Sequence, residues 1–114
     1  MDSSISAIIT KALDGLTLRA EATAQNIANA NSPNYRPVRV SFEEELASAA
    51  KGGELSIRAV EPKLNEAAAA GTSAQNRIDL ELATASETAQ RFGALVDVLS
   101  RELSLQRTLI RGGQ

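Results

Sequence analysis

The residues of this chain that could do acid–base or metal chemistry are its carboxylates, which are densest at Glu43–Glu45. The chain has no His and no Cys, so it lacks the commonest general base and metal ligand, and it lacks thiolate chemistry. It has no Asp-rich calcium loop, and its Gly-Gly pairs are isolated rather than part of a phosphate loop. We interpret Glu43–Glu45 as the first turn of a helix. The sequence predicts that the protein is not an enzyme and that it has no cofactor, no metal and no small-molecule substrate.

The basic residues do not predict a nucleic-acid site either. Arg36 and Arg39 flank Tyr35, but one aromatic side chain is too few for a stacking platform. The net charge is −2 and no basic run exists, so we expect no nucleic-acid partner. No apolar run approaches the roughly 18 residues of a transmembrane span, and the N-terminus lacks the pattern of a cleaved signal peptide. Aromatic residues make up only 3% of the chain, and much of its apolar content is Ala, which favours a thin, elongated molecule.

The most unusual stretch is an Asn-rich run that ends beside the first proline, with four Asn between positions 26 and 34. Four Asn so close together are unusual at a helix end, because the Asn side chain competes for backbone hydrogen bonds. One interpretation is a helix terminus with Asn caps and a turn. The other is that Asn26 and Asn29 flank a helix seam and hydrogen-bond across a helix interface, which would fix its register. The sequence leaves both interpretations open.

Two long segments are predicted to be helices, each with a narrow apolar seam at the 3.5-residue spacing typical of packed helices. The first covers residues 1–31 and ends where Ser32 precedes Pro33. The second covers residues 78–111 and would be roughly 50 Å long. The seam of the first contains Ile9, Leu13, Leu16, Ala20, Thr23, Ile27 and Ala30. The seam of the second contains Ile78, Leu82, Ala85, Ala89, Phe92, Val96, Leu99, Leu103, Gln106 and Ile110.

A glycine lies inside the first predicted helix. Gly15 would cost about 1 kcal/mol there relative to Ala. We interpret it as a tolerated exposed position, with close backbone approach by a neighbour as the alternative.

Residues 32–77 are predicted to be a short irregular and extended segment. Residues 38–42 alternate apolar and polar side chains, which is typical of a strand. Ser41 and Glu44 match a capping box that would open a short helix near residues 42–50. Residues 54–60 alternate weakly between apolar and polar side chains, a pattern compatible with a single strand.

With at most two short strands, a real sheet is not expected. Residues 61–76 are low in complexity and are predicted to be a mobile linker. Asn76 or Asp79 is expected to cap the last helix.

These elements predict an all-α fold in one elongated domain of residues 1–114. Its two long terminal helices pack antiparallel as a coiled-coil-like hairpin, and the middle segment is an insert at one end. A seam this long needs a partner helix from the same chain or from other chains.

The Asn-rich run carries a family resemblance. Together with the upstream segment 12–19, it resembles the N-terminal signature of flagellar rod, hook and hook-associated axial proteins, an Asn-Ile-Ala-Asn run that closes the first helix. The matching stretch here is Ala24-Gln25-Asn26-Ile27-Ala28-Asn29-Ala30-Asn31-Ser32-Pro33-Asn34-Tyr35. Residues 40–43 and 99–110 resemble the corresponding parts of proximal rod proteins in particular. The sequence departs from the pattern at Ser32, where Thr is usual, and at Asn34, where Gly is usual; Asn tolerates a left-handed φ.

The resemblance implies a structural subunit of the proximal rod of the flagellar basal body. Such a subunit is exported unfolded through the type III apparatus without a cleaved signal peptide, and it assembles in the periplasm. Its partners would be other rod subunits, neighbouring copies of itself, and the export-gate adaptor and membrane ring at the rod base. The absence of Cys suits export unfolded into an oxidising compartment. The expected assembly interface consists of Leu13, Leu16, Asn26, Ile27, Asn29, Pro33, Tyr35, Phe92, Val96, Leu99, Leu103 and Ile110.

An alternative is a self-contained binding module, such as a small helical adaptor or a secretion chaperone. This alternative predicts a stable folded unit with a defined groove. An axial subunit instead needs other chains to cover its apolar seams.

Overall fold

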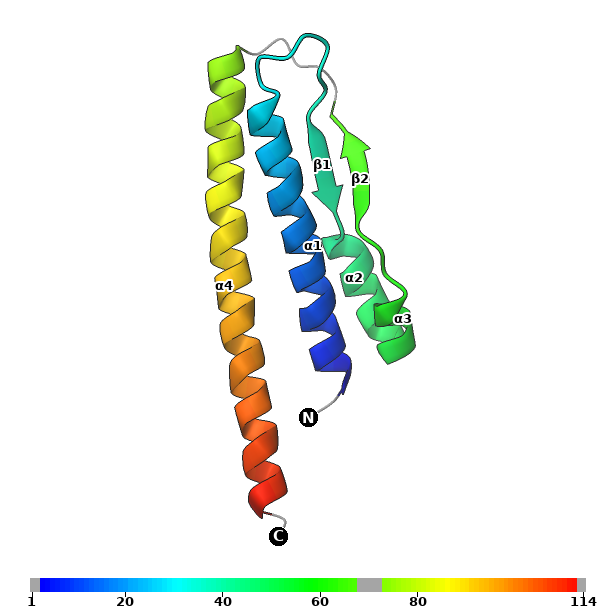
Figure 1. Ribbon diagram of the computed structural model, residues 1–114. Coiled ribbons are helices and arrows are strands. Elements are labelled where there is room, and N and C mark those ends of the chain that lie inside the picture. The colour runs from blue at the N-terminus through cyan, green and yellow to red at the C-terminus, as the bar shows by residue number, and fades with distance from the viewer. Residues whose placement is uncertain (1–2, 68–72, 113–114) are drawn as a thin grey trace.

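The computed structural model describes residues 3–67 and 73–112, and it confirms the predicted fold class. The long N-terminal helix and the longer C-terminal helix run antiparallel, and a short middle segment packs beside them (Figure 1). The molecule measures 63 × 25 × 14 Å. In chain order the elements are α1 (Ser3–Ala28), β1 (Val38–Ser41), α2 (Glu43–Ala49), the 3-10 helix η1 (Ala50–Gly52), α3 (Glu54–Arg58), β2 (Lys63–Glu66) and α4 (Ala74–Gly112).

The central element is α1. It contacts α4 on one side and β1, α2 and α3 on the other, so it lies between the long helix and the middle segment (Figure 1). The buried core therefore forms mainly between α1 and the middle segment rather than along two facing seams. Each large apolar side chain buried in this core contributes about 1.5–3 kcal/mol to the stability of the fold. The members of the core are Ala7, Leu16, Ala22, Val40, Phe42, Leu46, Ile57 and Val60.

The middle segment is more ordered than the sequence predicts. Residues 54–58 form α3, not a strand, because Gly53 turns the chain with a φ of 89° and Ile57 is then fully buried. The strand predicted from residue 38 is confirmed as β1. It pairs with β2 as a two-stranded antiparallel sheet, with Val38 opposite Glu66 and Ser41 opposite Lys63.

β2 lies within the segment that we predicted to be a linker. Its side chains are exposed, so no apolar alternation marked it, and it forms because β1 is already held against α1. Residues 68–72 of the predicted linker lie outside the described residues.

Two predicted helix caps are wrong. The Ser41–Glu44 capping box does not form: α2 begins after Phe42 without a side-chain cap, and the Ser41 hydroxyl instead accepts a hydrogen bond from Asn65 Nδ2 at 3.2 Å. Strand pairing with β2 therefore takes Ser41 away from the helix. α4 begins at Ala74, and its cap is Ser73, whose Oγ accepts the backbone N–H of Asn76 at 3.1 Å.

The first helix ends at Ala28, three residues before the predicted boundary. The chain turns there, and Asn34 has a φ of 64°, as expected for the position where the family pattern has Gly.

Gly15 marks a close approach, so our interpretation of it as an exposed, tolerated position is wrong. It is buried, and the ring of Phe42 lies directly over it. A Cβ atom built at this position would overlap Cγ and the neighbouring ring carbons of Phe42. The Arg19 guanidinium also lies 4.9 Å from the centre of that ring, which adds a cation–π contact. The glycine thus lets α1 receive the aromatic side chain that opens α2.

We predict that Gly15→Ala destabilises the protein, although alanine is the better helix former. The added methyl group must displace a buried ring, and such overpacking costs about 1–3 kcal/mol, more than the ~1 kcal/mol gained in helix propensity. Urea unfolding followed by circular dichroism measures the difference. Gly93→Ala in α4 is the matched control, because a Cβ atom there meets nothing within 4 Å and should stabilise the helix. Equal stabilisation by both changes would contradict this role of Gly15.

Candidate assembly interface

The apolar stripe of α4 is only partly covered by α1. Leu82 is 53% exposed, Val96 41% and Leu103 44%. The α4 residues buried against the rest of the chain are instead Glu81 and Thr88. Together with the half-buried Leu95 they recur every seven residues, one position before the predicted seam. The prediction that the two helices share their seams is therefore only partly right: α4 is rotated about its axis so that part of its apolar stripe faces away from α1.

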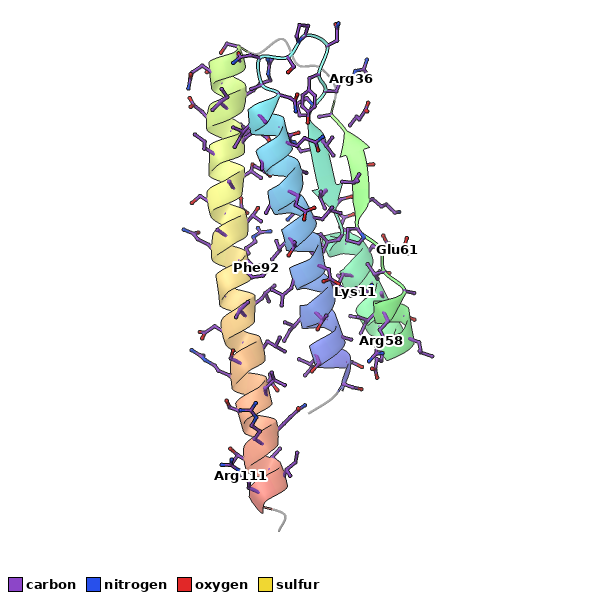
Figure 2. All side chains as sticks on the ribbon, viewed as in Figure 1. Lys11, Arg36, Arg58, Glu61, Phe92 and Arg111 are labelled. Atoms are coloured by element: carbon purple, nitrogen blue, oxygen red, sulfur yellow. The ribbon has the colours of Figure 1, made fainter. Side chains whose placement is uncertain are left out.

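The rotation opens an apolar groove along the α1–α4 contact, here called the α1/α4 groove. Small side chains from both helices line much of this groove. They let the two backbones come close but do not fill the space between the helices at the surface. Its large members are Leu16 and Ile27 of α1 and Phe92 of α4, and Figure 2 shows Phe92 near the middle of α4. The complete lining is Leu16, Thr17, Ala20, Thr23, Ala24 and Ile27 from α1, and Ala85, Thr88, Ala89, Phe92 and Gly93 from α4. Both predicted seams thus contribute to one open surface.

The C-terminal end of α4 extends past the described start of α1 (Figure 1). Asn26 contacts Glu81 across the two helices, so these two residues lie at the same level. Because the helices are antiparallel, each residue backward along α1 lies level with one residue further forward along α4. Ser3 therefore lies near the level of residue 104. Gln106 still lines a pocket with Ser3, Ala7 and Thr10, but the rest of the last two turns of α4 extends past the described residues of α1. Three large apolar side chains in those turns are exposed: Leu105 by 52%, Leu109 by 60% and Ile110 by 66%. We call residues 105–112 the α4 overhang.

Asn26 is the centre of a buried polar network between α1, β1 and α4. Its Nδ2 donates to the carbonyl of Val38 at 2.9 Å and to Glu81 Oε1 at 2.7 Å. Its Oδ1 accepts the Tyr35 hydroxyl and the Val38 N–H, both at 2.9 Å. Every hydrogen-bonding position of this amide is therefore used. Asn26 is 3% exposed, and it bonds across a helix interface as the second interpretation of the Asn-rich run proposed.

Glu81 anchors the other side of the same network. Arg39 Nη1 donates to its two carboxylate oxygens at 2.6 and 2.7 Å, so a carboxylate that is only 2% exposed has a charged partner. Burial, and then the negative charge of Glu81, raise the pKa of the Tyr35 phenol from its usual value of 10.0. The network fixes the axial register of α1 and α4 by polar contacts.

The other Asn side chain that we placed at the interface has a local role. Asn29 Nδ2 donates to the carbonyl of Gln25 at 3.0 Å, and its Oδ1 accepts the Ser32 hydroxyl at 3.1 Å. These contacts close the end of α1, as the first interpretation of the Asn-rich run proposed. A further contact across the helices comes from Arg77, which donates to the carbonyl of Ala30 at 2.7 Å.

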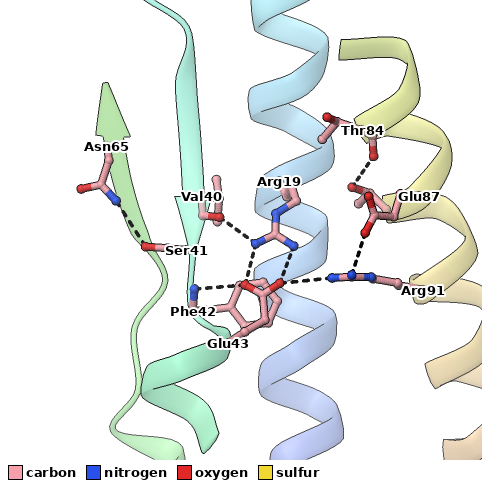
Figure 3. A network of polar contacts seen from close by, with 10 residues as sticks. Arg19, Val40, Ser41, Phe42, Glu43, Asn65, Thr84, Glu87 and Arg91 are labelled. Atoms are coloured by element: carbon pink, nitrogen blue, oxygen red, sulfur yellow. Dashed lines mark hydrogen bonds and ion pairs between the residues drawn. The ribbon is translucent and has the colours of Figure 1, made fainter. Parts of the chain in front are cut away.

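A second polar network joins α1, α2 and α4 at Glu43 (Figure 3). The Arg19 guanidinium donates to both Glu43 oxygens at 2.6 and 2.7 Å and to the Val40 carbonyl at 2.7 Å. Arg91 of α4 reaches the same carboxylate at 3.4 Å and pairs with Glu87 at 2.6 Å. The Arg19 hydrogen bonds lower the pKa of Glu43 below its usual value of 4.5.

This shift predicts an acid-dependent loss of stability. Because the pKa of Glu43 is lower in the folded state, its contribution is present above the unfolded-state pKa and is lost as the pH falls through the folded-state pKa. We expect Glu43→Gln to make stability fall less steeply below about pH 4.5. Thermal unfolding across that range measures this. Glu44→Gln, at an exposed neighbour in α2, should leave the slope unchanged, and an identical effect of the two changes would contradict the role of Glu43.

The remaining predicted interface residues do not form one cluster. Leu13 and Leu99 are half-buried beside the helix contact, Val96 and Leu103 are exposed along α4, and Pro33 is exposed in the turn after α1. The residues that sequence reasoning missed are the polar partners Arg39 and Glu81, the ring of Phe42, and the Arg19–Glu43 pair. Their contacts span 42 residues for Arg39–Glu81 and 24 for Arg19–Glu43, so no local pattern indicates them, although Glu81 and Thr88 share one helix face.

Neither a family model nor a curated protein matches this chain at a significant level. Among the described residues, the helices are too short or too polar to cross a membrane.

Proposed function

We propose that this chain is a structural subunit of the proximal rod of the bacterial flagellar basal body, similar to FlgB proteins. The observation that carries the proposal is the open apolar surface formed by the α1/α4 groove and the α4 overhang. Apolar patches of this kind on soluble proteins mark sites where another chain binds. The helix that lines the groove ends in the Asn-rich run that resembles the axial-protein signature, so the motif and the unpartnered surface occur on the same element.

The geometry also suggests what the motif does. Asn26, Tyr35 and their partners hold α1 and α4 in one register, and in this register side chains of both helices line the groove. In this account, the motif shapes the surface and the apolar side chains of both helices bind the neighbours. The neighbours would be other rod subunits and copies of the same chain in the periplasm. At the rod base they would include the export-gate adaptor and the membrane ring, after export unfolded without a cleaved signal peptide.

A deletion of the gene in the source bacterium, complemented by the tagged chain, tests this proposal. We expect the deletion to abolish swimming and to leave basal bodies without rods. The tagged chain should restore both and be detected in isolated basal bodies. Swimming at the normal rate in the deletion strain would contradict the proposed function.

A self-contained adaptor or secretion chaperone is the second candidate, and the defined groove on a folded helix pair favours it. The same strains separate the two functions. A chaperone would be required for swimming but would stay in the cytoplasm and be absent from isolated basal bodies. A rod subunit would be retained there.

A further inference from the structure

The chain itself contains a segment that fits the α1/α4 groove. We propose that the groove of one copy binds the α4 overhang of a second copy, with the two α4 helices pointing in the same direction and displaced along their axis. The inference rests on the proposed function, because it names the occupant of a surface that a rod subunit would use. It adds which segment binds, in which direction, and that the contact is between copies of this chain.

The overhang of a given copy cannot fill its own groove. Ala20 in the groove lies near the level of residue 87 of α4, as the Asn26–Glu81 contact fixes the register. Ile110 is therefore about 35 Å away along the same straight helix, at 1.5 Å per residue. If this segment occupies the groove, it must come from another copy.

The two surfaces are complementary in size. The groove wall is formed largely by Ala20 and Ala24 of α1 and Ala89 and Gly93 of α4, and this leaves room for large side chains. The overhang supplies large apolar side chains, Leu105, Leu109 and Ile110, which are all more than half exposed. Pairing large side chains of one helix with small side chains of its neighbours allows close packing.

The two surfaces are also complementary in charge. Asp14 and Glu21 are exposed on α1 within one helical turn of Thr17, which lines the groove. Arg107 and Arg111 are the only charged residues of the overhang, and Figure 2 shows Arg111 at the far end of α4. Within the part of the chain that the structure describes, none of these four charges has an ion-pair partner.

The charges also argue for displaced rather than level neighbours. Two copies side by side at the same height would place the basic overhangs together. A displacement of roughly 20 residues along α4, about 30 Å, brings the basic overhang beside the acidic flank of the groove instead. Because the groove and the overhang are different surfaces of one chain, each bound copy still offers a free groove or a free overhang. Such a heterologous contact can continue into an open-ended array, as a rod requires.

Disulfide crosslinking tests the contact directly, because the chain has no Cys of its own. Purified Ala20→Cys and Ile110→Cys chains are mixed under mild oxidation and resolved without reductant. We expect the 20–110 disulfide to be the dominant product. Ala47→Cys, at an exposed position of α2, replaces Ala20→Cys in the matched control and should give little product with Ile110→Cys.

Charge exchange tests the same contact by a second route. Glu21→Arg in the Ala20→Cys chain should reduce the 20–110 product severalfold, and Arg107→Glu in the Ile110→Cys chain should restore it. Dominant 20–20 or 110–110 disulfides, or a yield equal to that of the control, would overturn the inference. If basal bodies contain the chain but this crosslink fails, the inference alone is wrong. If the deletion strain swims normally, the proposed function is wrong.

Discussion

Asn26→Leu is expected to lower the free energy of unfolding by about 3 kcal/mol or more, even though leucine is the more apolar residue. The change removes the amide that serves the Tyr35 hydroxyl, both backbone groups of Val38 and one Glu81 oxygen. Each buried polar group left unpaired costs about 1–3 kcal/mol, and the extra apolar burial returns at most about 2 kcal/mol. Urea denaturation monitored by circular dichroism measures the loss. Assembly should fall as well, because the register of the two helices is no longer fixed.

Asn29→Ala is the matched control for this prediction. Asn29 belongs to the same motif, but its side chain bonds only to the end of its own helix and to Ser32. The loss should be about 0.5–1 kcal/mol, as for a helix-terminal hydrogen bond. If the two changes destabilise the protein equally, Asn26 does not have the central role described here.

Ile27→Asp and Phe92→Asp are expected to abolish rod assembly and swimming while the chain stays folded. Both residues line the α1/α4 groove, one from each helix, and Phe92 is already 38% exposed. Phe92 is exposed and Ile27 is half-buried at the border of the groove, so a carboxylate at either position can reach water in the free chain. It would be buried without a partner once another helix occupied the groove. Swimming, and retention of the chain in isolated basal bodies, measure assembly, and circular dichroism of the purified variants measures folding.

Leu55→Asp is the control for the groove variants. Leu55 lies in α3, is 84% exposed, and is not part of the groove, so its replacement should leave swimming intact. Normal swimming with Ile27→Asp and Phe92→Asp would show that the groove is not an assembly surface.

The sequence predicts the two long helices well because their formation depends on repeated local spacing. It does not predict the rotation of α4. The positions that face α1 include Glu81 and Thr88. A polar side chain is predicted to be exposed unless a partner for it is known. The partner of Glu81 is Arg39 on β1, 42 residues earlier, which no local pattern can supply. The sequence therefore predicts the apolar residues of the candidate site but not the polar partners Arg39 and Glu81.

The middle segment shows the same limit for local rules. Ser41 and Glu44 match a capping box, but Ser41 pairs in a strand whose partner begins 22 residues later. Gly15 looks like a tolerated helix defect, yet it contacts Phe42, which is 27 residues away in sequence. In both cases a tertiary contact decides the role of a residue whose sequence neighbours suggest another.

We expect other chains to cover the α1/α4 groove when the protein is assembled. Maleimide labelling of an Ala89→Cys variant, as the free purified chain and within isolated basal bodies, tests it most directly, because the chain has no other Cys. A Leu55→Cys variant reports general access to the reagent. We predict that Ala89→Cys reacts readily in the free chain and is protected at least tenfold in basal bodies, while Leu55→Cys reacts in both. Equal reaction of Ala89→Cys in the two states would contradict the account.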